Sequence, residues 1–172
     1  MTDLLNIMLS RRSHRRYTDE LISDDELHQI LVAGLCAPSS NNRKSARFIV
    51  VKDRDVLLSL SKAKTSGGQM LKQAACAIVV YGDTAVSDAW IEDCSLAMIQ
   101  MHLMADAMGL GSCWVQMRGR SNEHESADVT IKQLLSLKET DSVEAVLSLG
   151  HVDKKLEGYD MSQFDTNSIR II

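Results

Sequence analysis

The sequence contains few aromatic residues, a single proline and only a small excess of negative charge, and each of these features limits the class of protein it can encode. Phe, Trp and Tyr make up 4% of its 172 residues, so nine methionines supply bulk and adaptable packing instead. A single proline, together with the absence of repeats and low-complexity segments, predicts one domain over residues 1–172. The net charge of −4 argues against a general nucleic-acid binder.

Signatures of several enzyme classes are also absent. No GKS or GKT loop is present, and Gly109-Leu110-Gly111 lacks the third glycine of a dinucleotide fingerprint. Asp128 stands where a zinc protease would place a second histidine after His124. We interpret His102 as a core histidine, because no second histidine is spaced to join it at a metal. The sequence therefore predicts neither a metal site nor nucleophilic hydrolysis.

The four cysteines form no CxxC pair, which excludes a zinc knuckle and a dithiol redox motif. Each lies singly within an apolar segment, so we expect reduced core residues at Cys36, Cys76, Cys94 and Cys113. The first residues do not follow the pattern of a signal peptide, since Asp3 comes early and arginines follow. These features predict a cytoplasmic location.

The longest apolar stretch is Asp88–Trp114, and its apolar residues recur at helical spacing on one face and fill much of the other. Glu92, Asp93 and Asp106 interrupt the stretch, so it is not a membrane span. A helix that is apolar nearly all round must be buried on nearly all sides. One domain of this size can cover one face and part of a second. We therefore expect a partner subunit to cover the rest, in a homodimer.

The remaining pattern alternates between helices and strands. Ser23 and Glu26 form a capping box, which predicts a helix that continues to about Cys36. From His151 the chain is polar and irregular as far as a short β-prone end, Ser168–Ile172. Periodicity predicts the other elements: helices over 3–9, 53–60 and 127–137, a helical turn over 69–73, and strands over 47–52, 75–81, 112–117 and 143–149.

Two polar segments are candidates for ligand binding. Residues 11–17 (RRSHRRY) carry four arginines within six positions. A solvated basic turn is the simpler interpretation, whereas the acidic overall charge, and Ser13 among forked guanidinium donors, favour an anionic ligand such as a phosphate. Residues 37–42 (APSSNN) are ordinary turn residues, but their amides and short side chains could equally ring a planar polar ligand.

Together with GLGSCW at Gly109–Trp114 and LSLGHVDKK at Leu147–Lys155, these segments resemble the nitroreductase family of flavin enzymes over essentially the whole chain. The resemblance implies an α+β fold with a mixed, mainly antiparallel sheet flanked by helices. It also implies a domain-swapped homodimer with two FMN sites at the interface. In such a dimer, the segment from about residue 160 to residue 172 would extend onto the sheet of the partner subunit.

The resemblance assigns roles to both polar segments. Arg11 is expected to reach the FMN phosphate, with Arg12 and Ser13 against the phosphate–ribityl region and the pyrimidine edge. Arg15 matches the position whose cation faces flavin N1 and O2, where reduction places negative charge. The other subunit is expected to contribute four residues to each site, namely Pro38, Ser39, Ser40 and Asn42.

Two further segments receive roles from the resemblance. Trp114, Val115 and Gln116 are expected to lie along the isoalloxazine, with a backbone N–H near N5. Lys155, or its neighbour Lys154, is expected to complete the phosphate site. The chemistry then belongs to the flavin, and no protein residue is expected to act as an acid or a nucleophile.

The sequence departs from the family pattern in two places. Many members carry a Gln-Pro-Trp-like segment after Asn42, where this chain has Arg43-Lys44-Ser45-Ala46. We expect Arg43 and Lys44 to form a basic rim that favours NADPH or an anionic acceptor. Only Gly82–Ser87 separate a strand from the central helix, so we expect an open, shallow active site.

The resemblance therefore implies an FMN-dependent NAD(P)H oxidoreductase. Electrons would pass by a ping-pong scheme through FMN to nitroaromatic, quinone or similar acceptors, and neither nucleic acid nor a membrane is expected as a partner. Three alternatives stay open: a specialised flavin reaction such as reductive dehalogenation, a non-catalytic flavin-storage or sensing dimer, and an anion-binding dimer without flavin. The first ranks lower, because we find no extra segments that would cover a substrate.

Overall fold

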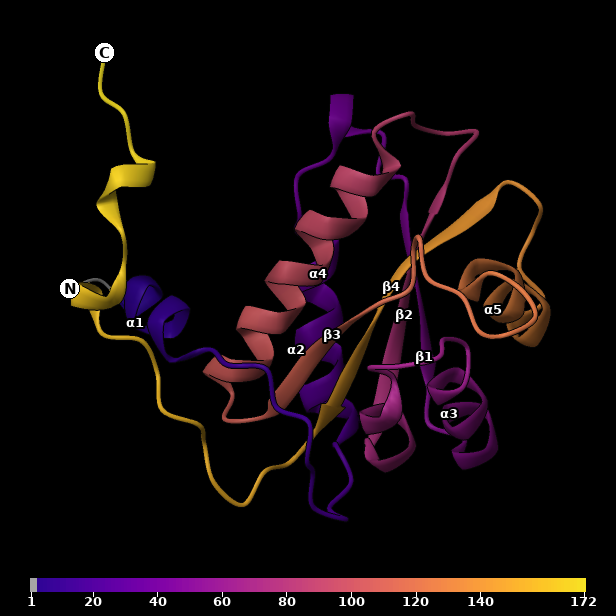
Figure 1. Ribbon diagram of the computed structural model, residues 1–172, viewed down its shortest axis with the longest axis horizontal. Coiled ribbons are helices and arrows are strands. Elements are labelled where there is room, and N and C mark those ends of the chain that lie inside the picture. The colour runs from indigo at the N-terminus through magenta and orange to yellow at the C-terminus, as the bar shows by residue number, and fades with distance from the viewer. Residues whose placement is uncertain (1–2) are drawn as a thin grey trace.

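A four-stranded antiparallel sheet forms the centre of the computed structural model, which describes residues 3–172 (Figure 1). The strand order is β1-β2-β4-β3. Helices α2 and α4 lie on one face of this sheet, and α3 and α5 lie on the other. The strands are β1 (Ala46–Val51), β2 (Cys76–Asp83), β3 (Gly111–Gln116) and β4 (Asp141–Gly150). The helices are α1 (Asp3–Ser10), α2 (Asp24–Leu35), α3 (Arg54–Ser61), α4 (Trp90–Ala107) and α5 (Ala127–Leu135), with short 3₁₀ turns η1 (Ser40–Asn42), η2 (Gln69–Gln73), η3 (Met161–Gln163) and η4 (Thr166–Ser168).

The α+β architecture confirms the expected fold class, and local signals account for several helix ends. Ser23 and Glu26 form the predicted capping box at the start of α2. Helix α5 ends two residues before the expected Leu137, because Ser136 adopts a left-handed conformation with φ 53°. All three strand pairs are antiparallel, and the parallel pairing described within residues 3–172 is one bridge, between Ser13 and Ser112.

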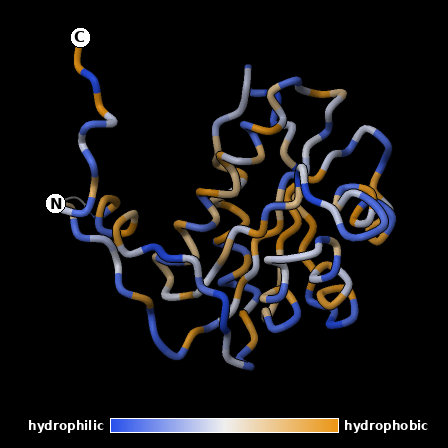
Figure 2. Tube along the Cα trace, viewed as in Figure 1, coloured by the Kyte–Doolittle hydropathy of each residue, from blue (hydrophilic) through white to orange (hydrophobic). Residues whose placement is uncertain are grey.

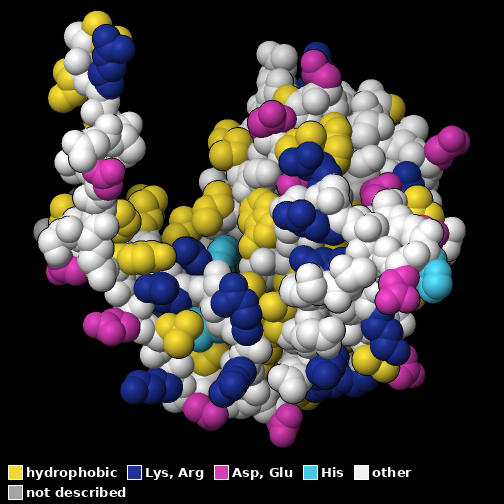
Figure 3. All heavy atoms as spheres, in the orientation of Figure 1, with side chains coloured by type: hydrophobic (Ala, Val, Ile, Leu, Met, Phe, Trp, Pro, Cys, Tyr) yellow, Lys and Arg dark blue, Asp and Glu magenta, His cyan; other side chains and the backbone are white. Residues whose placement is uncertain are grey.

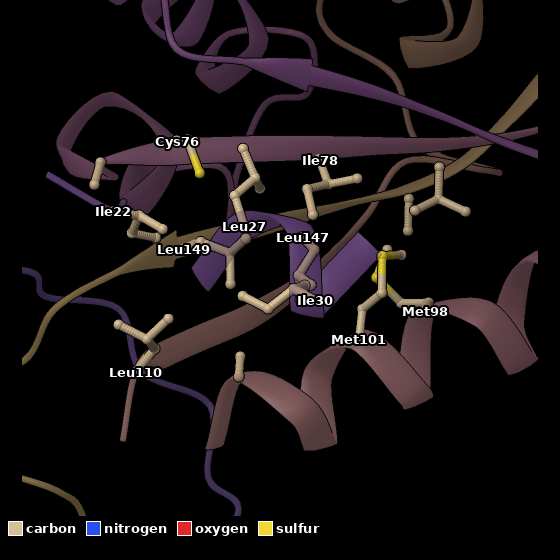
Figure 4. Packing of buried hydrophobic residues seen from close by; sticks show 14 of the residues in the cluster. Ile22, Leu27, Ile30, Cys76, Ile78, Met98, Met101, Leu110, Leu147 and Leu149 are labelled. Atoms are coloured by element: carbon tan, nitrogen blue, oxygen red, sulfur yellow. The ribbon is translucent and has the colours of Figure 1, made fainter. Parts of the chain in front are cut away.

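The core has two layers, one on each face of the sheet. Figure 4 shows Ile30 of α2 and Met98 and Met101 of α4 packing toward Ile78 of β2 and Leu147 of β4. The second layer lies between the opposite face and the α3, α5 and η2 segments. The central strands β2 and β4 are buried on both faces, so β2 begins with a continuous apolar run, whereas β4 is interrupted by the buried polar residues Glu144 and Ser148. Figure 2 shows the centre of the sheet largely in orange, the colour of hydrophobic residues.

Helix α4 is covered by its own chain on one side. Its buried residues include Met98, Met101 and Ala105, whereas Leu96 and Ile99 are 41% and 38% exposed. Helix α1 lies beside α4 and contains no buried residue. The expectation that a single chain covers only part of this helix is therefore confirmed, and an apolar strip of α4 faces outward.

The C-terminal segment leaves the end of β4, passes α1 and projects away from the sheet (Figure 1). The backbone N–H of Tyr159 donates to the carbonyl of Leu9 over 2.8 Å, which ties the segment to the end of α1. Every residue from Tyr159 onward is exposed, and Ile169 and Ile171 are 67% and 93% exposed.

One expectation about the cysteines is wrong. Cys76, Cys94 and Cys113 are buried, as predicted, but Cys36 is exposed. Cys36 is the C-cap of α2, where the chain turns away from the core into the 37–45 loop, so its side chain lies at the surface. Among residues 3–172, no helix is long and apolar enough to cross a membrane.

Candidate functional site

The basic segment 11–17 runs from α1 to the edge of β3. Ser13 forms a parallel bridge with Ser112, and the backbone N–H of His14 donates to the Ser112 carbonyl over 2.9 Å. Gly111 permits this close approach, since a Cβ there would lie 2.3 Å from Val152 Cγ1 and 3.0 Å from His14 Cβ. The segment is therefore held against β3 by backbone pairing.

Arg11 is held by a buried histidine of α4. An Arg11 Nη1 lies 2.9 Å from His102 Nε2, and His102 Nδ1 lies 2.5 Å from Ser112 Oγ. His102 is 3% exposed. Burial, and then the positive charge of Arg11, lower the pKa of His102 to about 4, so the ring is neutral at pH 7.

Lys155 is held one helical turn further along α4. Its Nζ donates to the backbone carbonyl of Asp106 over 2.8 Å and lies 3.8 Å from Asp106 Oδ2. Ser10 Oγ donates to the same carboxylate oxygen over 2.6 Å. Successive turns at the end of α4 therefore hold Arg11 and Lys155, whereas Lys154 lines a hollow beside Arg15.

That hollow has a volume of about 430 Å³ and is lined by Ser13–Tyr17, Val152–Lys154 and Leu156. Figure 3 shows Lys and Arg side chains gathered over this part of the molecule, near the segment that follows α1. Arg15 is exposed there, and its Nη1 donates to the Ser13 carbonyl over 3.4 Å.

Arg12 does not share this arrangement. Its Nη1 donates to the Glu157 carbonyl over 3.0 Å, and its guanidinium carbon lies 4.3 Å from the centroid of the Tyr159 ring. This cation–π contact turns Arg12 toward the C-terminal segment. The structure therefore brings Arg11, Ser13 and Arg15 to the edge of β3 but directs the side chain of Arg12 away from them.

The end of β3 presents backbone groups and one indole ring. Carbonyls of Ser112 and Gln116 accept hydrogen bonds from the His14 N–H and from Lys64 Nζ, so both point away from β4. Because antiparallel residues alternate in direction, the N–H of Trp114 also points away from β4. Val115 has its side chain buried in the core, and by the same alternation its backbone groups face β4, where it pairs with Val146, so it offers a ligand neither a side chain nor a free backbone group.

Side chains along β3 are linked in a chain of hydrogen bonds. The indole N–H of Trp114 donates to Gln116 Oε1 over 2.7 Å, and Gln116 Nε2 donates to Glu144 Oε1 over 3.2 Å. Arg118 Nε donates to the other Glu144 oxygen over 2.6 Å, which compensates the burial of that carboxylate. The Trp114 and Gln116 side chains are therefore fixed in advance of any ligand.

The 37–45 loop lies at the other end of α4. Asn41, Asn42 and Lys44 have φ values of 49°, 56° and 50°, a conformation that non-glycine residues seldom adopt. Asp93 in the first turn of α4 holds the loop, because Oδ1 accepts from the Ser40 N–H at 2.8 Å and Oδ2 accepts from Ser45 Oγ at 2.6 Å. Backbone strain of this kind is maintained only where its surroundings enforce it.

The two candidate segments are far apart within one chain. Asp93 and His102 are nine residues apart on one helix, which corresponds to about 14 Å along its axis. Figure 1 shows the loop near the first turn of α4 and the basic segment near its last turn. One chain therefore does not bring Pro38, Ser39, Ser40 and Asn42 together with Arg11–Arg15.

The sequence reasoning missed three positioning residues, all on α4. In the sequence, Asp93 and Asp106 interrupt an apolar run and His102 has the pattern of a core residue, whereas in the structure each of them orients a candidate binding segment. Their number is the signal in the sequence that could identify them. Each of three ionisable residues in a helix that must be buried needs a hydrogen-bonding partner.

The chain is similar to known proteins in both sequence and fold. A model described as the nitroreductase family matches residues 8–151. An FMN-dependent nitroreductase from Clostridium difficile is 38% identical, with a TM-score of 0.94 over 97% of this chain and 98% of that one. A protein of Archaeoglobus fulgidus, provisionally named an NADH dehydrogenase/NAD(P)H nitroreductase, is 37% identical over 93% of this chain and 91% of its own.

A third comparison concerns a protein from Desulfovibrio desulfuricans that was solved in complex with FMN. It is 26% identical, with a TM-score of 0.80 over 98% of this chain and 96% of that one. The family model covers most of the chain, and the relatives match it over nearly their whole length. The chain belongs to the nitroreductase family.

Proposed function

We propose that the protein is an FMN-dependent NAD(P)H oxidoreductase that passes electrons to nitroaromatic, quinone or similar acceptors in a ping-pong scheme. The observation that carries this proposal is the placement of Arg11 and Lys155 by one end of α4, beside the β3 edge. The relatives support the same activity, since one is described as an FMN-dependent nitroreductase and another is complexed with FMN.

The residues present fit FMN by the chemistry of their donors. Arg11 and Lys155 would hold the phosphate, Ser13 and Arg15 the ribityl and pyrimidine regions, and the β3 backbone the ring edge. Arg12 would join them only after leaving the Tyr159 ring. When bound, FMN supplies a carrier that takes two electrons from NAD(P)H and gives them to the acceptor. The protein supplies position, and Arg15 supplies positive charge beside the pyrimidine ring.

We also propose a homodimer with two sites. Two α4 helices packed antiparallel through Leu96 and Ile99 would bring the first turn of one helix beside the last turn of the other. This pairing would place Pro38, Ser39, Ser40 and Asn42 of one chain near Arg11 of its partner. It would also cover apolar surface that is exposed in a single chain.

The same proposal gives the C-terminal segment a role. Residues 160–172 carry apolar side chains that touch no core in their own chain. Within residues 3–172, no strand pairs with the outer edge of β1, whereas Ser13 and Lys64 already bond to the outer edge of β3. We place the end of the segment against the partner subunit's β1. A cytoplasmic location for the dimer stays a prediction.

Arg43 and Lys44 form the proposed basic rim. Arg43 lies 3.4 Å from Asp88, but its side chain is 45% exposed and that of Asp88 is 93% exposed, so the pair is weak. Replacement of both cations by alanine should lower any preference for NADPH over NADH. An unchanged ratio of kcat/KM values for the two cofactors would count against this role.

The visible absorption spectrum tests the proposed function, followed by anaerobic stopped-flow mixing with NADPH. We expect a yellow dimer whose flavin absorbance bleaches quickly and returns when an acceptor is added. A yellow protein that does not bleach would be a flavin-storage or sensing protein. A colourless protein that refuses added FMN would overturn the proposal and leave an anion-binding dimer.

A further inference from the structure

The inner face of α4 presents His102, a neutral side chain, to Arg11, although the usual partner of a partly buried arginine is a carboxylate. We propose that His102 is a positioning residue that aims the Arg11 guanidinium at the phosphate of the bound cofactor by accepting one of its hydrogen bonds. This inference rests on the proposed function. It adds a residue that touches no cofactor atom and acts through Arg11.

The hydrogen-bond chemistry fixes the state of the ring. Arginine has donors and no acceptor, so His102 Nε2, 2.9 Å from Arg11 Nη1, must carry the lone pair. In the neutral ring the proton is then on Nδ1, which donates to Ser112 Oγ over 2.5 Å. The imidazole is therefore held at both nitrogens, with β3 on one side and Arg11 on the other.

A neutral acceptor has a specific advantage at this point. A carboxylate in place of His102 would fix Arg11 equally well but would neutralise its charge and compete with a phosphate. The imidazole occupies one of five guanidinium N–H groups and leaves the positive charge and the other donors for an anion. Burial keeps the ring uncharged, since His102 is 3% exposed.

The nearby carboxylate, Asp106, is bonded to Ser10 and paired with Lys155, and not with Arg11. Asp106 lies one turn beyond His102, and its Oδ2 accepts from Ser10 Oγ over 2.6 Å. Lys155 bonds to the backbone carbonyl of Asp106 at 2.8 Å and stays 3.8 Å from the carboxylate oxygen. Arg11 is thus oriented by a neutral acceptor, whereas Lys155 is oriented by a backbone carbonyl and by an ion pair with Asp106.

Three substitutions separate this role from plain packing. His102→Gln keeps an acceptor near the position of Nε2, His102→Asn keeps only a polar group near Nδ1, and His102→Leu keeps neither. We expect His102→Asn and His102→Leu to raise the FMN dissociation constant about tenfold, the usual effect of losing one hydrogen bond to a charged group. His102→Gln should stay close to wild type.

The measurement is a titration of the apoprotein with FMN, followed by the loss of flavin fluorescence. His28→Leu, at an exposed histidine of α2, is the matched control and should leave the dissociation constant unchanged. In an Arg11→Gln background, His102→Leu should cause no further loss, because the residue through which it acts is already gone. An equal loss in both backgrounds would show a merely structural role and overturn the inference.

The tautomer gives a second readout that needs no FMN. A long-range ¹H–¹⁵N spectrum should show His102 with a protonated Nδ1 and an unprotonated Nε2, and the reverse tautomer would overturn the inference. If wild type binds FMN and His102→Leu binds it equally well, only the role of His102 fails. If wild type binds no FMN, the proposed function itself fails, and this role with it.

Discussion

At the scale of single residues, the molecule depends on three ionisable side chains buried in an apolar helix. A buried polar group costs free energy unless it is hydrogen-bonded, and Asp93, His102 and Asp106 are each bonded to a segment outside α4. The bonds reach η1, the basic segment and the end of α1. The same residues that are expensive to bury therefore hold the candidate site in shape.

Asp93→Ala should destabilise the protein by about 3 kcal/mol, because the Ser40 N–H and the Ser45 hydroxyl would lose a charged acceptor that is 2% exposed. Urea unfolding followed by circular dichroism measures this change. Asp88→Ala, at a side chain 93% exposed, is the control and should change stability by less than about 0.5 kcal/mol. Equal effects of the two substitutions would contradict the assignment.

His102 also predicts a pH dependence. Its pKa is about 4 in the folded protein and 6.5 as the reference value, so the unfolded chain binds the proton more tightly. Stability is therefore lost as the pH falls from 6.5 toward 4, by about 3 kcal/mol over the whole window.

His102→Gln isolates this contribution, because other groups titrate alike in both proteins. The wild-type protein should lose more stability than the variant between pH 6.5 and pH 4, as measured by urea unfolding at a series of pH values. Parallel stability profiles would show that His102 is charged in the folded state or does not titrate in this range.

At the scale of elements, local signals were predictable and contacts between distant segments were not. The capping box of Ser23 and Glu26 lies within four residues, so the sequence alone predicts where α2 begins. The bridge between Ser13 and Ser112 joins residues 99 positions apart, and no local pattern in either segment predicts this pairing. Arg12 shows the same limit, since its direction is set by Tyr159 in a segment with no regular periodicity.

The family motifs, unlike local patterns, predict that distant segments meet in one site. The resemblance assigns RRSHRRY and GLGSCW to one site, and in the structure both segments lie at the edge of β3. The motifs could not reveal Asp93, His102 or Asp106, because these residues act through the motif residues and not on a ligand. The exposed position of Cys36 was also missed, since it depends on how the chain leaves α2.

Helix α4 yields a prediction about assembly. Leu96→Glu would place a charge in the middle of the proposed helix pair, so it should convert the dimer to a monomer and abolish FMN binding. Light scattering coupled to size-exclusion chromatography measures the mass. Val129→Glu on α5, at a residue 39% exposed against 41% for Leu96, is the control and should leave the dimer intact. A dimeric Leu96→Glu protein would exclude this interface.

At the scale of the whole molecule, the described chain is a well-packed sheet and helix body with two peripheral parts, α1 and the C-terminal segment. Neither α1 nor residues 159–172 contain a buried residue. Exposed apolar residues in both parts, such as Leu4 at 57% and Ile171 at 93%, make sense when a second subunit covers them.

Removal of residues 160–172 tests the exchanged segment. We expect the shortened chain to fold with an unchanged far-ultraviolet circular dichroism spectrum apart from the small loss of η3 and η4. Its dimer should dissociate at concentrations at which the full chain stays paired, as measured by sedimentation equilibrium. An unchanged dissociation constant would show that the segment does not reach across to the partner subunit.

The placement of the two candidate segments at opposite ends of α4 has a genetic consequence. In the proposed homodimer, a chain carrying Arg11→Gln and a chain carrying Asp93→Ala would each form dimers in which both proposed sites are damaged. In a mixed dimer, one centre would receive both lesions and the other would receive none. Co-expression of the two inactive alleles should therefore restore about a quarter of the wild-type activity, because random pairing makes half of the dimers mixed and each of these has one intact centre.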